Sequence, residues 1–309
     1  MVTPSTARTR LLGAAAGLLA DRVLGEPPAA WHPVAGFGHL MTRLERSWYA
    51  DDTTAGAVYA AVGVAAGVTA GVAARSTALT VACTTAGRML RTTARQVADA
   101  LDAGDLDHAR GILPALVGRD PARLDAPGIA AATIESLAEN TVDAVVAPAL
   151  WGAALGAPGA AAHRAVNTMD AMVGHHSDRY ERFGRVGARL DDAAAYIPAR
   201  VTAVLVCASR PDRARAVITA VRRDASAHPS PNAGVAEAAF AAALGVELGG
   251  PTRYAGRLED RPRLGRGPRP EGTDITRAVG LADRVELVLA GLLAALGLAL
   301  AARARSARP

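Results

Sequence analysis

The chain contains no lysine, because all 34 of its basic residues are arginine. A Schiff-base lysine and the lysine of a Walker A loop are therefore excluded from its chemistry. Aromatic residues make up only 4% of the chain while half of the residues are apolar, so the apolar content comes mainly from small side chains. Small side chains suit close helix–helix contact in lipid. A soluble, alanine-rich helical protein would have a similar composition and stays an alternative at this point.

Cysteine is equally scarce. Cys83 and Cys207 lie in apolar stretches with no CxxC pattern or histidine beside them, which is typical of small buried residues and predicts no disulfide framework. The net charge of +5 is modest, and the arginines are interleaved with acidic residues. We therefore predict no nucleic-acid partner. Arginine-rich faces suit anionic lipid or a phosphorylated substrate.

The pattern of apolar residues shows neither a series of β-strands nor an internal repeat. It predicts an all-α fold, a polytopic integral membrane protein with amphipathic, water-exposed helices between its spans. Residues 53–74 are uncharged and long enough to cross a bilayer, and hydropathy favours about four to six spans. We expect residues 1–309 to form a single membrane-embedded domain. Within it, residues 88–126 should form a water-exposed helical hairpin and residues 250–273 a flexible loop.

Three carboxylates stand at the edge of a long uncharged run. Glu135, Glu139 and Asp143, called here the carboxylate ladder, precede residues 144–162, which carry no charge. On a continuous helix they would share one face and span roughly 12 Å. Like charges at this spacing destabilise a helix, so a metal, a proton or a counter-charge should offset the cost. A solvated polar face explains the spacing about as well as a reaction centre does.

Other polar residues also interrupt apolar segments. Asp191 and Asp192 could hold Mg²⁺ or pair with nearby arginines. Glu237 and Asp21 are ionisable groups in otherwise apolar helices, which favours a functional role. Residues 230–234 could receive an anion at a helix start, or Asn232 could be an ordinary N-cap. The neighbouring His175 and His176 point apart on a helix, so a zinc site is disfavoured.

Several short blocks of sequence, taken together and in order, resemble the CobD/CbiB family of cobalamin biosynthesis, adenosylcobinamide-phosphate synthase. The matching blocks lie between about residues 21 and 256 and are Asp21 to Pro27 with His32 to Val34, Val117 to Asp120, the carboxylate ladder with Asn140, Thr141 and Pro148, Asn167 to Asp170 with Gly174, Arg179, Tyr180, Phe183 and Gly184, Arg189 to Asp192 with Ile197 to Arg200, and Ser230 to Gly234 with Leu248 to Gly250. Two positions depart from the family pattern: Ala195 replaces a usual Asn, and His176 a common Lys.

The resemblance implies a multi-pass enzyme of the cell membrane. It would join adenosylcobyric acid to aminopropanol or its O-phosphate through an amide on the corrin ring. Its partners would be the corrinoid, the amine and membrane lipid, with a complex of corrinoid-pathway enzymes as a further expectation. Forming an amide from a carboxylate requires activation, so we expect ATP and Mg²⁺, although no nucleotide motif is present.

Site residues are assigned by the chemistry of the side chains within these blocks. The predicted catalytic residues are Glu135, Glu139, Asn140, Asp143, Asp170 and Glu237. The predicted metal ligands are Asp191 and Asp192. The predicted substrate-binding residues are Asp21, His32, Arg119, Asn167, Arg179, Tyr180, Arg189, Arg200, Ser230 and Asn232. Of these, Arg179, Arg189 and Arg200 would take phosphate groups.

Two other functions fit part of the pattern. A membrane Mg²⁺-dependent phospho- or prenyl-transferase would use similar Asp and Asn clusters, but the paired Asp-rich motif of such enzymes is missing. A transporter or assembly subunit without chemistry would bury fewer charges beside its spans than residues 117–143 and 163–192 carry.

Overall fold

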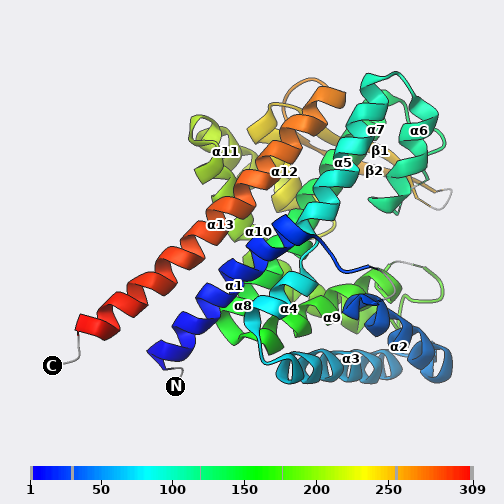
Figure 1. Ribbon diagram of the computed structural model, residues 1–309. Coiled ribbons are helices and arrows are strands. Elements are labelled where there is room, and N and C mark those ends of the chain that lie inside the picture. Colours follow the sequence, from blue (N-terminus) through cyan, green and yellow to red (C-terminus); the bar gives the residue numbers. More distant parts are fainter. Residues whose placement is uncertain (1–2, 29–30, 119, 176, 255–256, 307–309) are drawn as a thin grey trace. The chain divides into compact units, whose positions relative to one another are not determined.

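The computed structural model describes residues 3–28, 31–118, 120–175, 177–254 and 257–306, and most of them are helical (Figure 1). The all-α membrane fold predicted from the sequence is confirmed. Within the described ranges, three helices are long and apolar enough to cross a membrane, namely α3 (Thr53–Ala74), α10 (Arg185–Ser209) and residues 272–303 of α13 (Gly272–Ser306). This is fewer than the four to six suggested by hydropathy, because other apolar helices such as α8 (Ala147–Leu155) are short.

The chain forms two compact units. Unit 1 contains residues 1–86, 143–195 and 289–309, and unit 2 contains residues 87–142 and 196–288. In unit 1, α1 (Pro4–Leu24) packs against α4 (Thr77–Thr84) and α8, while α3 packs along α9 (Ala157–Val173). Helix α2 (Pro33–Trp48) lies against α9 and α3.

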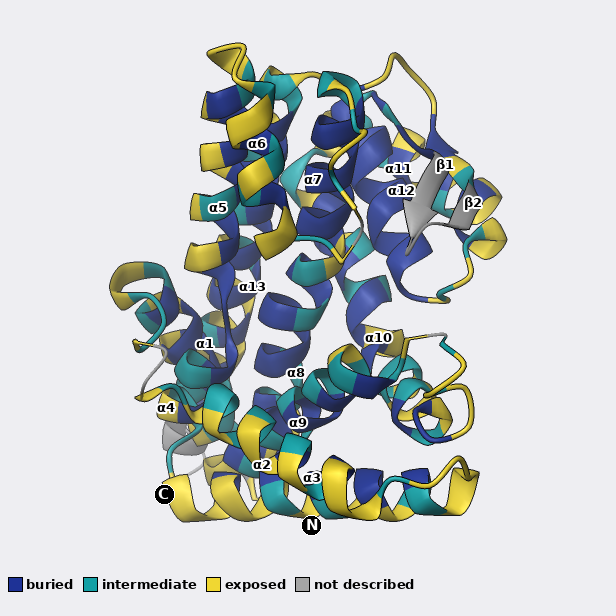
Figure 2. Cartoon of the chain, turned by 90° about the vertical axis from the view of Figure 1, so that its right-hand side faces the viewer, coloured by how far each residue is buried: buried dark blue, intermediate teal, exposed yellow. Residues whose placement is uncertain are grey.

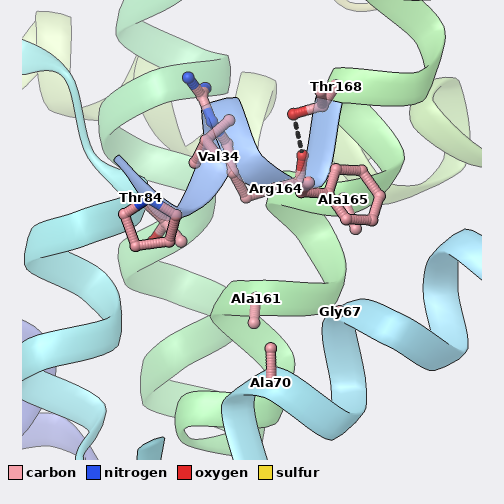
Figure 3. Close-up of a pocket in the computed structure, with 10 residues that line it drawn as sticks. Val34, Gly67, Ala70, Thr84, Ala161, Arg164, Ala165 and Thr168 are labelled. Carbon is pink, nitrogen blue, oxygen red and sulfur yellow. Dashed lines mark hydrogen bonds between the residues drawn. The ribbon is translucent and has the colours of Figure 1, made fainter. Parts of the chain in front are cut away.

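Glycines on α3 set its close approach to α9. The outer side of α3 is exposed and its inner side is buried (Figure 2), and Gly63, Gly67 and Gly71 lie on the buried side. A Cβ at Gly67 would lie 2.8 Å from the Cβ of Ala165 on α9 (Figure 3). A side chain therefore does not fit there, and the small residues that dominate the composition explain how these two helices pack.

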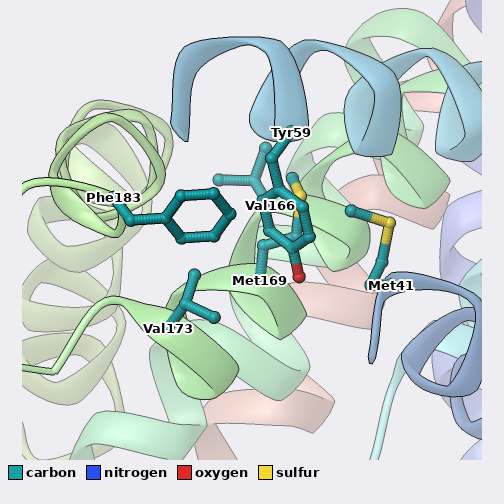
Figure 4. Close-up of a cluster of buried hydrophobic side chains, with 6 residues drawn as sticks. All are labelled: Met41, Tyr59, Val166, Met169, Val173 and Phe183. Atoms are coloured by element: carbon teal, nitrogen blue, oxygen red, sulfur yellow. The ribbon is translucent and has the colours of Figure 1, made fainter. Parts of the chain in front are cut away.

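The core of unit 1 contains its few large side chains. Tyr59 and Phe183 are almost fully buried, with ring centroids 5.0 Å apart. The methionines Met41 and Met169 and two valines complete this buried cluster (Figure 4). The cluster ties α2, α3, α9 and the segment before α10 together, which fixes where the polar residues of α9 point.

Unit 2 is built around two buried helices, α7 (Ala126–Thr141) and α12 (Ala233–Leu244). All residues of α12 are buried, and α12 packs against α7 and α11 (Ala214–Asp224) (Figure 2). Apart from Glu237 the helix is apolar on every side, so it is covered on every side, and it is too short to cross a bilayer. The segment predicted as a water-exposed hairpin contains α5 (Gly87–Asp102) and α6 (Leu106–Ile112), joined at residues 103–105, and one face of α5, including Leu90 and Val97, is buried.

The prediction of a flexible loop at residues 250–273 is wrong. Strands β1 (Glu247–Tyr254) and β2 (Arg257–Gly265) form an antiparallel hairpin, with Leu248 opposite Leu264. Both leucines are fully buried. The Gly, Pro and Arg content of this segment conceals the strands, and Gly249, at φ +77°, supports an irregular register between Leu248 and Gly250.

A π-helical turn interrupts the carboxylate ladder. Helix α7 ends at Thr141, and residues 142–146 form the π-helix before α8 begins. The α-helical spacing that would align Asp143 with Glu139 therefore ends before Asp143. The expectation that all three carboxylates share one helix face is wrong for Asp143, because a π-helical turn has more residues per turn than an α-helix. Such turns are frequent at functional sites.

Candidate functional site

Asn167 on α9 joins two carboxylates of unit 1. Its amide nitrogen lies 3.3 Å from Oδ2 of Asp143, in the π-helical turn, and 3.4 Å from Oδ1 of Asp191, on α10. Its amide oxygen accepts from Nη1 of Arg164 at 3.4 Å. These four residues, called here the Asn167 cluster, come from three separate segments, so the fold brings together three of the predicted site residues and adds Arg164.

Arg164 also links the cluster to the loop before α2. Burial raises the pKa of Glu26 above its usual value, and the carboxylate of Asp21 raises it further. The positive charge of Arg164 reduces this rise. Nε2 of His32 lies 3.7 Å from Oε2 of Glu26, and Nδ1 of His32 accepts from the backbone N–H of Val34 at 3.2 Å. This bond places the ring proton on Nε2, facing Glu26. Burial lowers the pKa of His32, so the ring is neutral near pH 7.

A small pocket of about 80 Å³ borders Arg164. Its other lining residues are mainly apolar and include Val34, Ala161 and Ala165, while Thr84 and Thr168 add two hydroxyl groups (Figure 3). The hydroxyl of Thr168 donates to the backbone carbonyl of Arg164 at 2.7 Å. The pocket is large enough for about two or three water molecules, and not for a corrin ring.

Asp170 and Asp192 form a second acidic pair beside this cluster. Burial raises the pKa of Asp170, the carboxylate of Asp192 raises it further, and His175 lowers it. A Cβ at Gly174 would lie 1.9 Å from Oδ1 of Asp170, so only glycine fits there. Asp191 contacts Asn167, whereas the adjacent Asp192 acts on Asp170. Consecutive residues point apart on a helix, which explains the different partners.

The Asn167 cluster fits magnesium better than zinc. Mg²⁺ keeps several waters and is usually held by one or two carboxylates together with substrate phosphates. Asp143 and Asp191 supply two such carboxylates. In the part of the chain that the structure describes, no group of three or more His, Cys, Asp or Glu could hold a metal by itself.

Unit 2 contains a pocket of about 410 Å³ at the start of α12. Arg200 and His228 line it, and Nη1 of Arg200 donates to Oδ1 of Asn232 at 2.9 Å. Oγ of Ser230 accepts from the N–H groups of Asn232 and Ala233, at 3.3 and 3.2 Å. Ser230 therefore accepts from the N–H groups at the start of α12, while the side chain of Asn232, the N-cap residue, makes no capping bond and binds Arg200.

Two buried glutamates lie beside His228. Nε2 of His228 is 3.7 Å from Oε1 of Glu237, while Glu135 accepts from the N–H of Gly249 at 2.8 Å. Both glutamates are at most 3% exposed. Burial lowers the pKa of His228, as does the charge of Arg261, whereas a backbone hydrogen bond with Ser230 and the carboxylate of Glu135 raise it. The net shift keeps this imidazole neutral near pH 7.

The remaining predicted residues lie outside both groups. Glu139 is exposed, and the amide of Asn140 donates to the carbonyl of Ser136 at 2.9 Å within its own helix. Tyr180 and Arg179 both contact Oε1 of Glu45, at 2.7 and 3.1 Å.

These contacts fix the loop before α10 rather than leave the two side chains free for a ligand. Arg189 is exposed and makes no hydrogen bond or ion pair with the residues that the structure describes. Arg119 lies outside the described residues.

Sequence reasoning missed Arg164, Glu26 and His228. Arg164 is the first arginine after the uncharged run and stands three residues before Asn167, so helical spacing alone predicts their contact. His228 begins the Pro-rich loop that leads into α12. Glu26 gave no signal of its own, because its position in a Gly-Glu-Pro-Pro turn is typical of a surface residue.

Comparison with known proteins gives a consistent result over nearly the whole chain. A family profile described as CobD/Cbib protein matches residues 14–282. "Cobalamin biosynthesis protein CobD" of Mycobacterium tuberculosis H37Rv is 47% identical over 295 residues, covering 91% of this chain and 94% of the relative. The protein of the same name from Rhodobacter capsulatus is 40% identical over 297 residues, covering 90% and 93%. No solved structure matches the chain.

Proposed function

Since the chain belongs to the CobD/CbiB family of cobalamin biosynthesis proteins, we propose that it is a multi-pass membrane ligase that forms an amide on a corrinoid. It would attach aminopropanol, or its O-phosphate, to a side-chain carboxylate of adenosylcobyric acid. The observation that carries this reaction class is the convergence of Asp143 and Asp191 on the amide of Asn167. Two carboxylates fixed in this way suit a magnesium ion that is shared with a nucleotide phosphate.

ATP with Mg²⁺ would supply the activation of the corrin carboxylate, which is otherwise a poor electrophile toward an amine. The protein would bind the metal ion and balance the charges around it. Asp143 and Asp191 would hold the metal, Asn167 would keep the two carboxylates in place, and Arg164 would limit the repulsion between them. Because Asn167 contacts both carboxylates, it acts as a positioning residue in this scheme.

The pocket of unit 2 has the complementary chemistry for a small amine. Arg200, oriented by Asn232, offers N–H donors to the phosphate of a phosphorylated aminopropanol. His228 is neutral near pH 7 and could accept the proton that an ammonium must lose before it attacks. The buried carboxylates of Glu135 and Glu237 would stabilise the resulting imidazolium.

Corrinoid profiling of a strain that lacks this gene tests the proposal. We expect cobyric acid to accumulate and added cobinamide to restore cobalamin synthesis. The gene that encodes Asp143→Asn should fail to complement the strain, whereas Asp107→Asn, at a side chain that is 95% exposed, should complement it. An unchanged corrinoid profile in the deletion strain would exclude the ligase and leave the phospho- or prenyl-transferase to be tested.

A further inference from the structure

A second pocket in unit 2 is lined by arginines. It has a volume of about 370 Å³ and lies against α11 and one residue of α12, Ala242. Its charged lining residues are Arg213, Arg215, Arg223 and Arg266. No residue of this pocket takes part in the Asn167 cluster or in the pocket beside His228, and none was among the predicted site residues.

Positive charge exceeds negative charge around this pocket. Arg223 is paired with Asp224, which it contacts through Nε and Nη2 at 2.5 and 2.6 Å. Asp224 also accepts from the backbone N–H of Gly265 at 3.0 Å, so this carboxylate is already used by the fold. Asp212 is held by Arg210 at 2.7 Å. Among the described side chains, Arg213, Arg215 and Arg266 have no carboxylate within ion-pair distance.

The backbone fixes where these arginines stand. A Cβ at Gly245, at φ +75°, would lie 2.4 Å from Nη2 of Arg213, so the guanidinium rests against a glycine. Arg266 follows the end of β2, whose Gly265 is bonded to Asp224. Two segments that are distant in the sequence, residues 213–223 and Arg266 after β2, therefore present guanidinium groups to one pocket, which a solvated charged helix face would not require.

We propose that this pocket binds a phosphate or diphosphate group. Guanidinium groups stay charged at any physiological pH and match phosphate oxygens with two parallel N–H bonds. The volume lies within the range of small-ligand pockets, roughly 300–1,000 Å³. The phosphate could belong to a soluble molecule or to a lipid headgroup, since both present the same anion. The inference does not depend on the proposed amide-forming activity.

The test measures binding to the full-length protein in detergent and in nanodiscs. Inorganic diphosphate is titrated calorimetrically in the presence of phosphatidylcholine alone. Retention of phosphatidylglycerol over phosphatidylcholine is measured separately by mass spectrometry. The variant is Arg213→Gln with Arg266→Gln, and the matched control is Arg222→Gln, at an exposed arginine of α11 that does not line the pocket. A second variant, Arg213→Lys with Arg266→Lys, retains charge if the glutamine variant does not fold.

Diphosphate binding that falls roughly tenfold or more in the glutamine variant and is unchanged in Arg222→Gln supports a soluble ligand. Selective phosphatidylglycerol retention with the same dependence supports a lipid headgroup. Where only the lysine variant folds, weakened binding supports the pocket, because lysine lacks the planar fork. Absence of both kinds of binding, or equal losses in the variant and in Arg222→Gln, would overturn the proposal.

Discussion

The amide nitrogen of Asn167 lies 3.3 Å from Oδ2 of Asp143, although the two residues are 24 positions apart. The contact depends on the π-helical turn, because Asp143 is its second residue and would be displaced on a continuous α-helix. The π-helical turn therefore directs the carboxylate of Asp143 toward Asn167 on α9.

Replacing Asn167 by Ala should lower cobinamide formation by about 10²-fold, because the two carboxylates would lose their common partner and shift. Replacing it by Gln keeps the amide and should retain more activity than Ala. The check is initial-rate kinetics with varied Mg²⁺, in which the apparent affinity for Mg²⁺ should fall in the Ala variant. An Ala variant with normal Mg²⁺ dependence would contradict the positioning role.

The ion pair between Arg91 and Glu286 should be essential to unit 2. Both side chains are buried, at 4% and 1% exposed, and Nε of Arg91 also lies 3.5 Å from Oδ1 of Asp283. Arg91→Met removes the guanidinium that pairs with the buried carboxylate of Glu286, and breaking a buried pair in this way typically costs about 3–5 kcal/mol. We expect thermal unfolding in detergent at a clearly lower temperature.

The double variant Arg91→Met with Glu286→Met removes both charges and should recover much of this loss. A double variant no more stable than Arg91→Met would show that the pair does not act as a unit.

Protonation of His228 should destabilise unit 2 at mildly acidic pH. In the unfolded chain the imidazole takes up a proton as the pH falls through about 6.5, whereas burial keeps the folded pKa below this value. Below about pH 6.5 the unfolded state therefore binds more protons, and the free energy of unfolding falls until the pH reaches the folded pKa.

His228→Asn should flatten this pH dependence, which thermal unfolding between about pH 5 and about pH 8 measures. His108→Asn is the control, since His108 is exposed. A wild-type protein whose stability did not change over this range would contradict the prediction.

The sequence predicted the helical class well and the shape of the site less well. Uncharged runs such as residues 53–74 form helices because apolar composition over that length leaves few alternatives. The block around Asn167 was recognised, but its contact with Asp191 joins different helices, and no local period encodes such a pairing. The π-helical turn and the hairpin at Leu248 also depend on tertiary packing, so spacing rules miss them.

The glycines of α3 offer a test of the packing in unit 1. A Cβ at Gly71 would lie 2.6 Å from the backbone oxygen of Ala157, which cannot move without displacing α9. Gly71→Ala should therefore destabilise unit 1 by about 1–3 kcal/mol. The control is Gly36→Ala on α2, where a Cβ meets nothing within 4 Å. Equal unfolding temperatures for the two variants would contradict the proposed α3–α9 contact.

The central claim is tested most directly by incorporation of radiolabelled aminopropanol, or its O-phosphate, into adenosylcobyric acid by membranes that contain the protein. We predict amide formation that requires ATP and Mg²⁺, that is lost in Asp143→Asn, and that proceeds normally in the exposed control Asp107→Asn. Formation of the amide at the wild-type rate by Asp143→Asn would contradict the assigned site. No incorporation by the wild-type membranes with either amine would contradict the ligase itself.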